Sequence, residues 1–138
     1  MDIRRKLTDI GLTQDSSVVI GSGILSALKL RASNDIDVVV PQSEYSRLTD
    51  SNHFTKTQNH GREILTDELF EIGTSWGVLG KDQAYDDLQN QSVVIDGVRY
   101  VRIEFLLAVK KSWLQDSDVR QKDIDDVELI EKYLKERK

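Results

Sequence analysis

The run from Asp35 to Pro41 constrains the fold of this chain more than any other part of its sequence. Four of the six residues before the proline are Ile or Val, which are enriched in β-strands. Pro41 has no N–H to donate to a strand ladder, so it ends the strand. Alternate side chains of a strand point to one face, which places Asp35 and Asp37 side by side, roughly 6.5–7 Å apart at Cα. Two carboxylates at this spacing repel each other and favour a bound cation.

A second strand and a glycine turn precede this run. Residues 17–20 are Ser-Val-Val-Ile, Gly21-Ser22-Gly23 follows, and residues 24–30 have a helical composition. A turn of small residues that opens a helix lets a phosphate approach backbone N–H groups, with the positive end of the helix dipole behind them. Gly21 and Ser22 would form this cradle. Taken alone, the turn is equally compatible with a plain strand-to-helix connection.

The aspartate pair on an otherwise apolar strand predicts a Mg²⁺ site. Magnesium typically takes one or two carboxylates and completes its shell with water and phosphate oxygens. The alternative is that Asp35 and Asp37 are solvated residues of an edge strand, because charged side chains commonly protect sheet edges. A phosphate cradle and a carboxylate pair on adjacent strands are together more specific than either feature alone.

The remaining sequence predicts one α+β domain over residues 1–138, with a small mixed sheet in the centre and helices packed on it. A helix is expected from Ser43, with its hydroxyl as the N-cap, and extended segments are expected near 63–65 and 69–74. Asp96-Gly97 between β-branched runs predicts a hairpin. Two C-terminal helices are expected over 103–114 and 118–136, the second opened by a capping box of Asp118 and Gln121.

Composition excludes several kinds of chemistry and partner. With no cysteine and two histidines, the chain lacks disulfides, thiol catalysis and the ligands of common zinc sites. A net charge of −5 disfavours a general nucleic-acid coat, which needs a basic surface. No apolar run reaches the ~20 residues of a membrane-spanning helix, and the N-terminus lacks the apolar stretch of a signal peptide. We therefore expect a cytoplasmic protein with no membrane partner.

The glycine turn, the helix and Asp35-x-Asp37 on the next strand resemble the signature of the nucleotidyltransferase superfamily whose archetype is DNA polymerase beta. The longer pattern Arg31-x-Ser33-x-Asp35-x-Asp37, followed by valines, is similar to that of small bacterial and archaeal members. These members include abortive-infection-type toxins and antibiotic nucleotidyltransferases. The resemblance implies that Gly21, Ser22, Arg31 and Ser33 lie around the nucleotide.

Lys110 and the pattern Arg120-x-Lys122-Asp123 are similar to helix-borne residues of the same small members. Lys110 falls inside the apolar stripe of its helix, where a lysine is out of place. Two interpretations stay open. Its ammonium reaches solvent along a packed stem, or it reaches the triphosphate, as the resemblance implies. Asp123 shares an apolar stripe of the last helix and is expected to orient Lys110 or another basic residue from a partly buried position.

The superfamily uses a third carboxylate from a later strand, which ligates metal and helps to deprotonate the attacking hydroxyl. We assign this role to Glu71, because its neighbours Phe70 and Ile72 are apolar, as expected around an inward-facing acid on a strand. Asp67 and Glu68, in the expected turn before it, are the rival candidates. The alternative interpretation is that Glu71 belongs to the polar face of a half-exposed strand and has no catalytic role.

The resemblance implies transfer of a nucleoside monophosphate from a triphosphate such as ATP to an acceptor hydroxyl, with release of pyrophosphate. Two Mg²⁺ ions, or Mn²⁺ in their place, would be held by Asp35, Asp37 and Glu71. The acceptor stays open among a small molecule, an RNA end and a protein side chain, and a homodimer or protein partner is compatible with the small size. The alternative functions are a catalytically inactive nucleotide- or protein-binding module on the same fold, as in a toxin–antitoxin pair, and a small α+β interaction domain.

Overall fold

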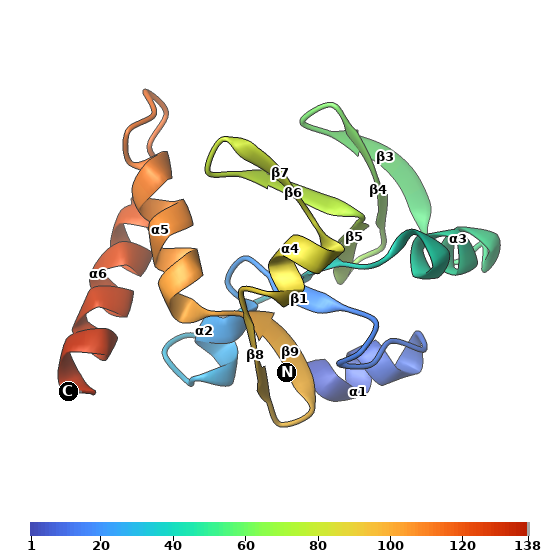
Figure 1. Ribbon diagram of the computed structural model, residues 1–138, viewed down its shortest axis with the longest axis horizontal. Coiled ribbons are helices and arrows are strands. Elements are labelled where there is room, and N and C mark those ends of the chain that lie inside the picture. The colour runs from blue at the N-terminus through green and yellow to red at the C-terminus, as the bar shows by residue number, and fades with distance from the viewer. Residues whose placement is uncertain (138) are drawn as a thin grey trace.

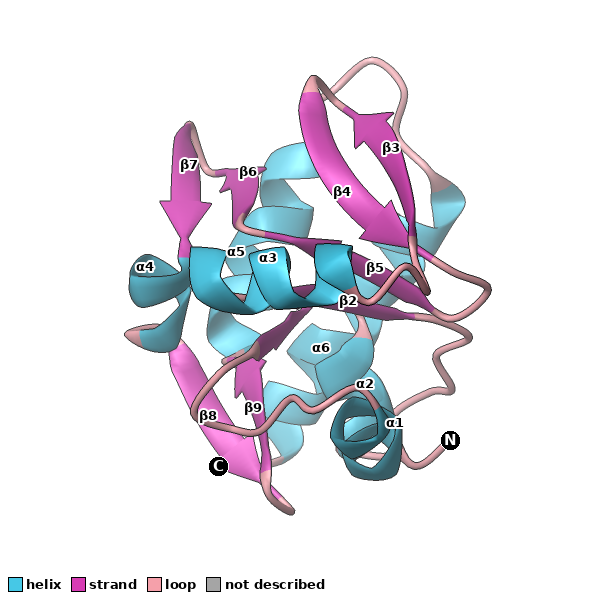
Figure 2. Ribbon diagram, turned by 90° about the vertical axis from the view of Figure 1, so that its right-hand side faces the viewer, coloured by secondary structure: helices cyan, strands magenta, loops and turns pink. Residues whose placement is uncertain are grey.

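A seven-stranded sheet forms the centre of the computed structural model, which describes residues 1–137 (Figure 2). Its strands are β1 (Val18–Ile20), β2 (Ile36–Val39), β3 (Thr55–Asn59), β4 (Arg62–Thr66), β5 (Phe70–Gly73), β8 (Ser92–Ile95) and β9 (Val98–Val101). Their order across the sheet is β3-β4-β5-β2-β1-β9-β8. The apolar, β-branched strands β1 and β2 therefore take central places, each with a paired strand on both sides.

The sheet is mixed, as the sequence predicts. Strand β2 runs parallel to β5 and antiparallel to β1, while β1 runs parallel to β9. In this register Ile20 lies opposite Asp37, and Asp37 lies opposite Glu71. Paired residues of neighbouring strands point to the same face. The two predicted acids, which are far apart in sequence, therefore lie side by side on one face of the sheet.

Within residues 1–137, six helices and a separate two-stranded sheet complete the fold. The helices are α1 (Ile3–Asp9), α2 (Gly23–Ala27), α3 (Gln42–Asp50), α4 (Tyr85–Gln89), α5 (Ile103–Trp113) and α6 (Gln121–Glu136), and the small sheet is β6 (Ser75–Val78) with β7 (Lys81–Ala84). All helices except α4 contribute to the main core, which includes Val19, Val38 and Ile72. Leu88 of α4 packs in a smaller cluster with Ile20 on the face that carries the acids.

Two hairpins and two helices enclose the space in front of this face. Figure 1 shows α5 and α6 side by side at the left end of the molecule. The β3–β4 and β6–β7 hairpins both project toward the top of that view. An ion pair of 2.7 Å between Arg62 of β4 and Asp82 of β7 joins the two hairpins. Among residues 1–137, no helix has the length and apolar character needed to cross a bilayer.

The expected hairpin and most of the expected strands are confirmed, but several boundaries differ. Asp96 and Gly97 turn between β8 and β9 with φ values of 50° and 78°, as a two-residue hairpin loop requires. The helix after the glycine turn ends at Ala27, and Lys29 follows it with a left-handed φ of 60°. Helix α3 follows Pro41 with no side-chain cap, so the expected serine cap is wrong.

Helix α6 begins at Gln121 rather than at 118, because Arg120 takes the N-cap position and makes no capping bond. The expected capping box of Asp118 and Gln121 is therefore wrong. Strand β3 lies inside a segment of exposed polar residues that carries no apolar alternation. Such an edge strand is specified by its pairing with β4, which a pattern of hydrophobicity does not reveal.

Candidate active site

Asp37 and Glu71 form a carboxylate pair at the centre of the site. Asp37 is half-buried, and its Oδ1 is a buried atom with no hydrogen-bond partner among residues 1–137. Burial raises the pKa of Asp37 to about 7, and the charges of Glu71 and then Asp35 add to the shift. The charge of Lys122 offsets these effects only in part, so an ionised carboxylate in this place is not fully compensated for its burial. The arrangement is therefore suited to a cation.

Gly21 leaves room directly beside this pair. The residue has a left-handed φ of 64°, and a Cβ built on it would lie 3.1 Å from Asp37 Oδ2. A glycine at this position therefore serves two needs, since it takes a conformation unfavourable for other residues and leaves the carboxylate accessible. The expected glycine turn therefore lies directly beside Asp37, and its contact with a phosphate stays a prediction.

Gly21→Ala should lower the free energy of unfolding by about 1–3 kcal/mol, through backbone strain together with the contact to Asp37. Gly80→Ala is the matched control, because Gly80 has a φ of 72° and nothing within 4 Å of its built Cβ. Urea denaturation of both variants separates the cost of backbone strain, which both share, from the cost of the contact with Asp37, which only Gly21→Ala has. Equal losses of unfolding free energy in the two variants would show that a Cβ at position 21 does not disturb the Asp37 carboxylate.

Ser22 and Ser33 connect the glycine turn to the segment before β2. Ser33 is buried, and its hydroxyl lies 3.0 Å from the backbone oxygen of Asp35 and 3.2 Å from the hydroxyl of Ser22. Since Ser33 donates to Asp35, Ser22 donates to Ser33. These bonds fix the spacing between the turn and the aspartates. Contact of either serine with a nucleotide stays a prediction.

The predicted set of three metal-binding carboxylates is brought together only in part. Asp35 is exposed and lies just before the first residue of β2. Within residues 1–137, no group of three or more His, Asp or Glu side chains is arranged to hold a metal ion. Asp37 and Glu71 nevertheless fit Mg²⁺, which commonly takes two carboxylates and fills its shell with water and phosphate oxygens. The uncompensated Oδ1 of Asp37 supports this fit.

Asp67 has a different role from the one proposed for Glu71. Its Oδ1 accepts hydrogen bonds from the backbone N–H groups of Leu69 and Phe70, at 2.8 and 2.6 Å, and its Oδ2 lies 2.9 Å from His53 Nε2. Asp67 therefore stabilises the turn before β5. Glu71, which is exposed rather than inward-facing, is the acid that lies beside Asp37.

Lys110 belongs to a buried ion cluster that joins α5, α6 and the segment before β2. Its ammonium lies 2.9 Å from Asp123 and 3.0 Å from Asp126, and its side chain is only 4% exposed. Arg31 bonds the carboxylate of Asp126 with two nitrogens, at 2.7 and 2.8 Å, while Arg120 bonds Asp123. The interpretation that Lys110 reaches solvent is therefore wrong. The expectation that Asp123 orients Lys110 agrees with this contact.

The two aspartates of the cluster are held in their charged form. Burial alone would raise both pKa values, but the hydrogen bonds outweigh it, so both pKa values lie below the ordinary value. For Asp123 the donors are Lys110 and Arg120, and for Asp126 they are Arg31 and Lys110. The sequence patterns above do not single out Asp126, although its spacing of three from Asp123 on one helix places both on one face.

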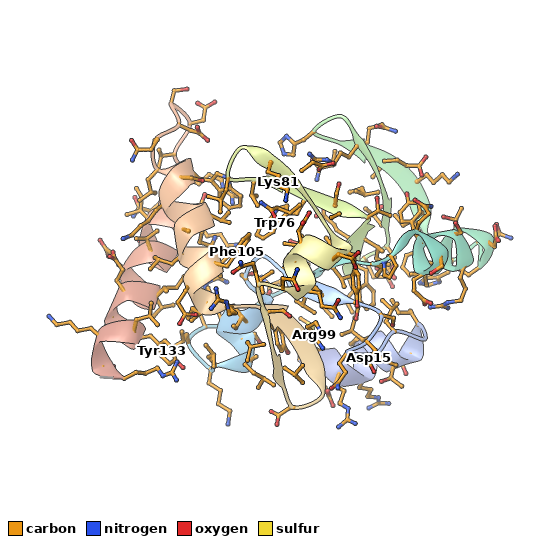
Figure 3. All side chains as sticks on the ribbon, in the orientation of Figure 1. Asp15, Trp76, Lys81, Arg99, Phe105 and Tyr133 are labelled. Atoms are coloured by element: carbon orange, nitrogen blue, oxygen red, sulfur yellow. The ribbon has the colours of Figure 1, made fainter. Side chains whose placement is uncertain are left out.

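A cavity of about 790 Å³ opens in front of the carboxylate pair. Asp37 and Glu71 lie on its sheet side, and Asp116, Asp118 and Arg120 lie on the side of the α5–α6 connection. Both tryptophans of the chain also line it, with ring centroids 6.3 Å apart. Figure 3 shows Trp76 with Phe105 between the β6–β7 hairpin and α5. The volume is in the range of small-molecule sites.

No protein-family model and no curated protein matches this sequence, but solved structures do. The solution structure of the antibiotic-resistance factor ANT(2'')-Ia is 18% identical and has a TM-score of 0.55, over 86% of this chain and 75% of that one. The crystal structure of ANT(2'')-Ia in complex with adenylyl-2''-tobramycin is 17% identical, with a TM-score of 0.57, over 86% and 79%.

JHP933 from Helicobacter pylori is 18% identical and has a TM-score of 0.53, over 96% of this chain and 66% of that one. ANT(2'')-Ia is an aminoglycoside nucleotidyltransferase, and JHP933 is a nucleotidyltransferase-like protein. The chain has the nucleotidyltransferase fold. The fold predicted from Gly21-Ser22 and Asp35-x-Asp37 is thus confirmed, while the roles of the individual residues are proposals.

Proposed function

We propose that this chain transfers a nucleoside monophosphate from a nucleoside triphosphate to an acceptor hydroxyl and releases pyrophosphate. The observation that carries the proposal is the Asp37–Glu71 pair beside Gly21, which faces a cavity in a nucleotidyltransferase fold. Phosphoryl transfer of this kind depends on positioned charge more than on a reactive side chain. A protein without cysteine and with two histidines is therefore suited to it.

Asp37 and Glu71, with Asp35 at the edge, are the residues that would hold Mg²⁺, as two ions or with Mn²⁺ in its place. The bound ions would offset the charge of the carboxylates and of the triphosphate. The burial and raised pKa of Asp37 support a role as the central ligand. Gly21 and Ser22 would present backbone N–H groups to the phosphates.

In this proposal Glu71 receives the proton of the acceptor hydroxyl. The acceptor oxygen forms a bond to the α-phosphorus, and the bond from that phosphorus to the bridging oxygen breaks. Its electron pair leaves with pyrophosphate, while the hydroxyl proton passes to the Glu71 carboxylate. The exposure of Glu71 on the cavity side supports this role, because a base must be accessible to the acceptor.

A small-molecule acceptor is the best supported of the three acceptor classes. The structurally similar ANT(2'')-Ia was determined with an adenylylated small molecule, and the cavity here has the volume of a small-molecule site. The net charge of −5 disfavours a long RNA, because phosphate contacts dominate such binding. Completion of the acceptor site by a second copy or another protein stays a prediction.

A catalytically inactive nucleotide- or protein-binding module on the same fold is the second candidate. It is favoured by the position of Asp35, which does not complete a three-carboxylate group with Asp37 and Glu71. Two carboxylates and a glycine turn are enough to bind a metal–nucleotide complex without turnover.

Glu71→Gln separates these candidates. The variant should keep much of its affinity for nucleotide, but its rate of pyrophosphate release should fall by about 10²-fold or more, because the proton acceptor is lost. Pyrophosphate release is measured for each nucleoside triphosphate, with a small-molecule extract as the source of acceptor. Glu68→Gln is the control, since Glu68 is exposed and does not line the cavity. Equal rates for both variants would reject Glu71 as the base, and no release by the wild type would favour the binding module.

A further inference from the structure

The cations that the sequence assigns to the triphosphate are already paired inside the protein. Lys110 contacts both Asp123 and Asp126, and Arg31 bonds Asp126 with two nitrogens. Both aspartates are at most 5% exposed. Withdrawal of either cation would break an ion pair of at least one buried carboxylate and leave it with one of its two cations, which is costly. A triphosphate in the cavity therefore calls for a cation with a weaker attachment.

Arg62 lies on the same face of the sheet as the carboxylate pair. Thr66 of β4 lies opposite Glu71 of β5. Because alternate residues of a strand share a face, Arg62 shares the face of Thr66. Arg62 lines the cavity together with Asp37 and Glu71. Its guanidinium thus belongs to the cavity wall that the site already uses.

Gly77 of the neighbouring hairpin makes room for this guanidinium. A Cβ built on Gly77 would fall on the guanidinium group of Arg62. Gly77 also lines the cavity. The guanidinium therefore lies against the backbone of β6 at the edge of the cavity. A larger residue at position 77 would occupy the space that it fills.

Arg62 is held by a weaker ion pair than Lys110 and Arg31 are. Its ion-pair partner is Asp82, and the two side chains are 37% and 62% exposed. Exposed pairs of this kind contribute little to stability and are easily broken. Arg120, the other arginine among the described lining residues, bonds instead to the buried carboxylate of Asp123. A guanidinium also matches phosphate oxygens with two parallel hydrogen bonds.

We propose that Arg62 binds the triphosphate, and that it exchanges Asp82 for phosphate when the nucleotide enters. The inference rests on the proposed function, since it names a further residue of that nucleotide site. It makes Asp82 a competitor of the phosphate. Removal of Arg62 and removal of Asp82 must then have opposite effects on phosphate binding.

Calorimetric titration of the full chain with inorganic tripolyphosphate and with MgATP tests this relation. Arg62→Gln should weaken binding of both by about tenfold, the scale of a charge-assisted hydrogen bond. Asp82→Asn should strengthen binding, and this gain should vanish in the double variant. Gly77→Ala keeps the charge but displaces the guanidinium, so it should weaken binding as Arg62→Gln does. Lys56→Gln, on the same hairpin but outside the cavity, should change nothing.

The inference is overturned if Arg62→Gln and Asp82→Asn shift the affinity in the same direction, as expected of a pair that only holds the hairpins together. It is also overturned if Arg62→Gln leaves the affinity unchanged or if wild-type protein does not bind tripolyphosphate. Loss of nucleotide transfer in Asp37→Asn, with normal tripolyphosphate binding in Arg62→Gln, would reject this inference alone. Tripolyphosphate binding that depends on Arg62, without any transfer activity, would reject the proposed function alone.

Discussion

Asp37→Asn should reduce nucleotidyl transfer by about 10³-fold or more while making the metal-free protein more stable at pH 8. The loss of rate follows from the proposed role of Asp37 as the central metal ligand, whose charge the variant removes. The gain in stability follows because Asp37 Oδ1 is buried without a hydrogen-bond partner. Equilibrium unfolding in urea with a chelator present measures the second effect. Asp9→Asn, at an exposed position of α1, is the control.

The stability gain should depend on pH in a defined direction. The pKa of Asp37 is raised from 3.8 to about 7 on folding, so the folded state holds the proton more tightly. Protonation therefore stabilises the wild type at low pH, and this stabilisation is lost as the pH rises through 7. The difference between Asp37→Asn and wild type should be largest at pH 8 and shrink toward pH 4, with a total change of no more than about 4 kcal/mol. A difference independent of pH would contradict the raised pKa.

Lys110→Met should lower the free energy of unfolding by about 3 kcal/mol, because it removes the charge shared by two buried carboxylates. The neighbouring Lys111→Met is the matched control. Lys111 pairs with Glu131 across the same two helices, but both side chains are 50% exposed, so its loss should cost less than about 1 kcal/mol. Thermal and urea unfolding at pH 7 measure both variants.

The pH dependence of the same cluster has the opposite sign from that of Asp37. Because the pKa values of Asp123 and Asp126 lie below 3.8, their stabilisation is present above about pH 4 and is lost as the pH falls below it. Lys110→Met should therefore be less sensitive to acid than wild type. Equal stability of the Lys110→Met and Lys111→Met variants would show that the cluster does not hold α5 and α6 together. Nucleotide affinity of the folded Lys110→Met protein tests the separate prediction that Lys110 reaches the triphosphate.

The elements that the sequence predicts correctly are those specified by local patterns. The alternation of Asp35 to Val40 and the glycine turn after Ile20 depend on residues close together in the chain. The Asp96-Gly97 hairpin is another case, since two residues decide its turn. The alternation of side chains along a strand also predicts that Asp37 points to the opposite face of the sheet from Ile36 and Val38.

The features that the sequence does not predict depend on distant partners. The pairing of Arg31 with Asp126 joins residues 95 positions apart, and no local pattern distinguishes Asp126 from a solvated helix charge. The parallel register that places Glu71 beside Asp37 is set by the packing of β2 on β5. From the sequence, Arg62 is a surface residue of a polar segment, and only the fold shows its contact with the β6–β7 hairpin. The cavity follows from these long-range contacts.

Calorimetric titration with each of the four nucleoside triphosphates, with and without Mg²⁺, decides whether this face of the sheet binds a metal–nucleotide complex. We expect the wild type to bind at least one of them in the presence of Mg²⁺, and we expect binding to weaken strongly without the metal. We expect the same weakening in Asp37→Asn with the metal present, because Asp37 is the half-buried carboxylate that faces the cavity. Absence of binding by the wild type, or binding indifferent to both Mg²⁺ and Asp37, would contradict a nucleotidyltransferase site on this face of the sheet.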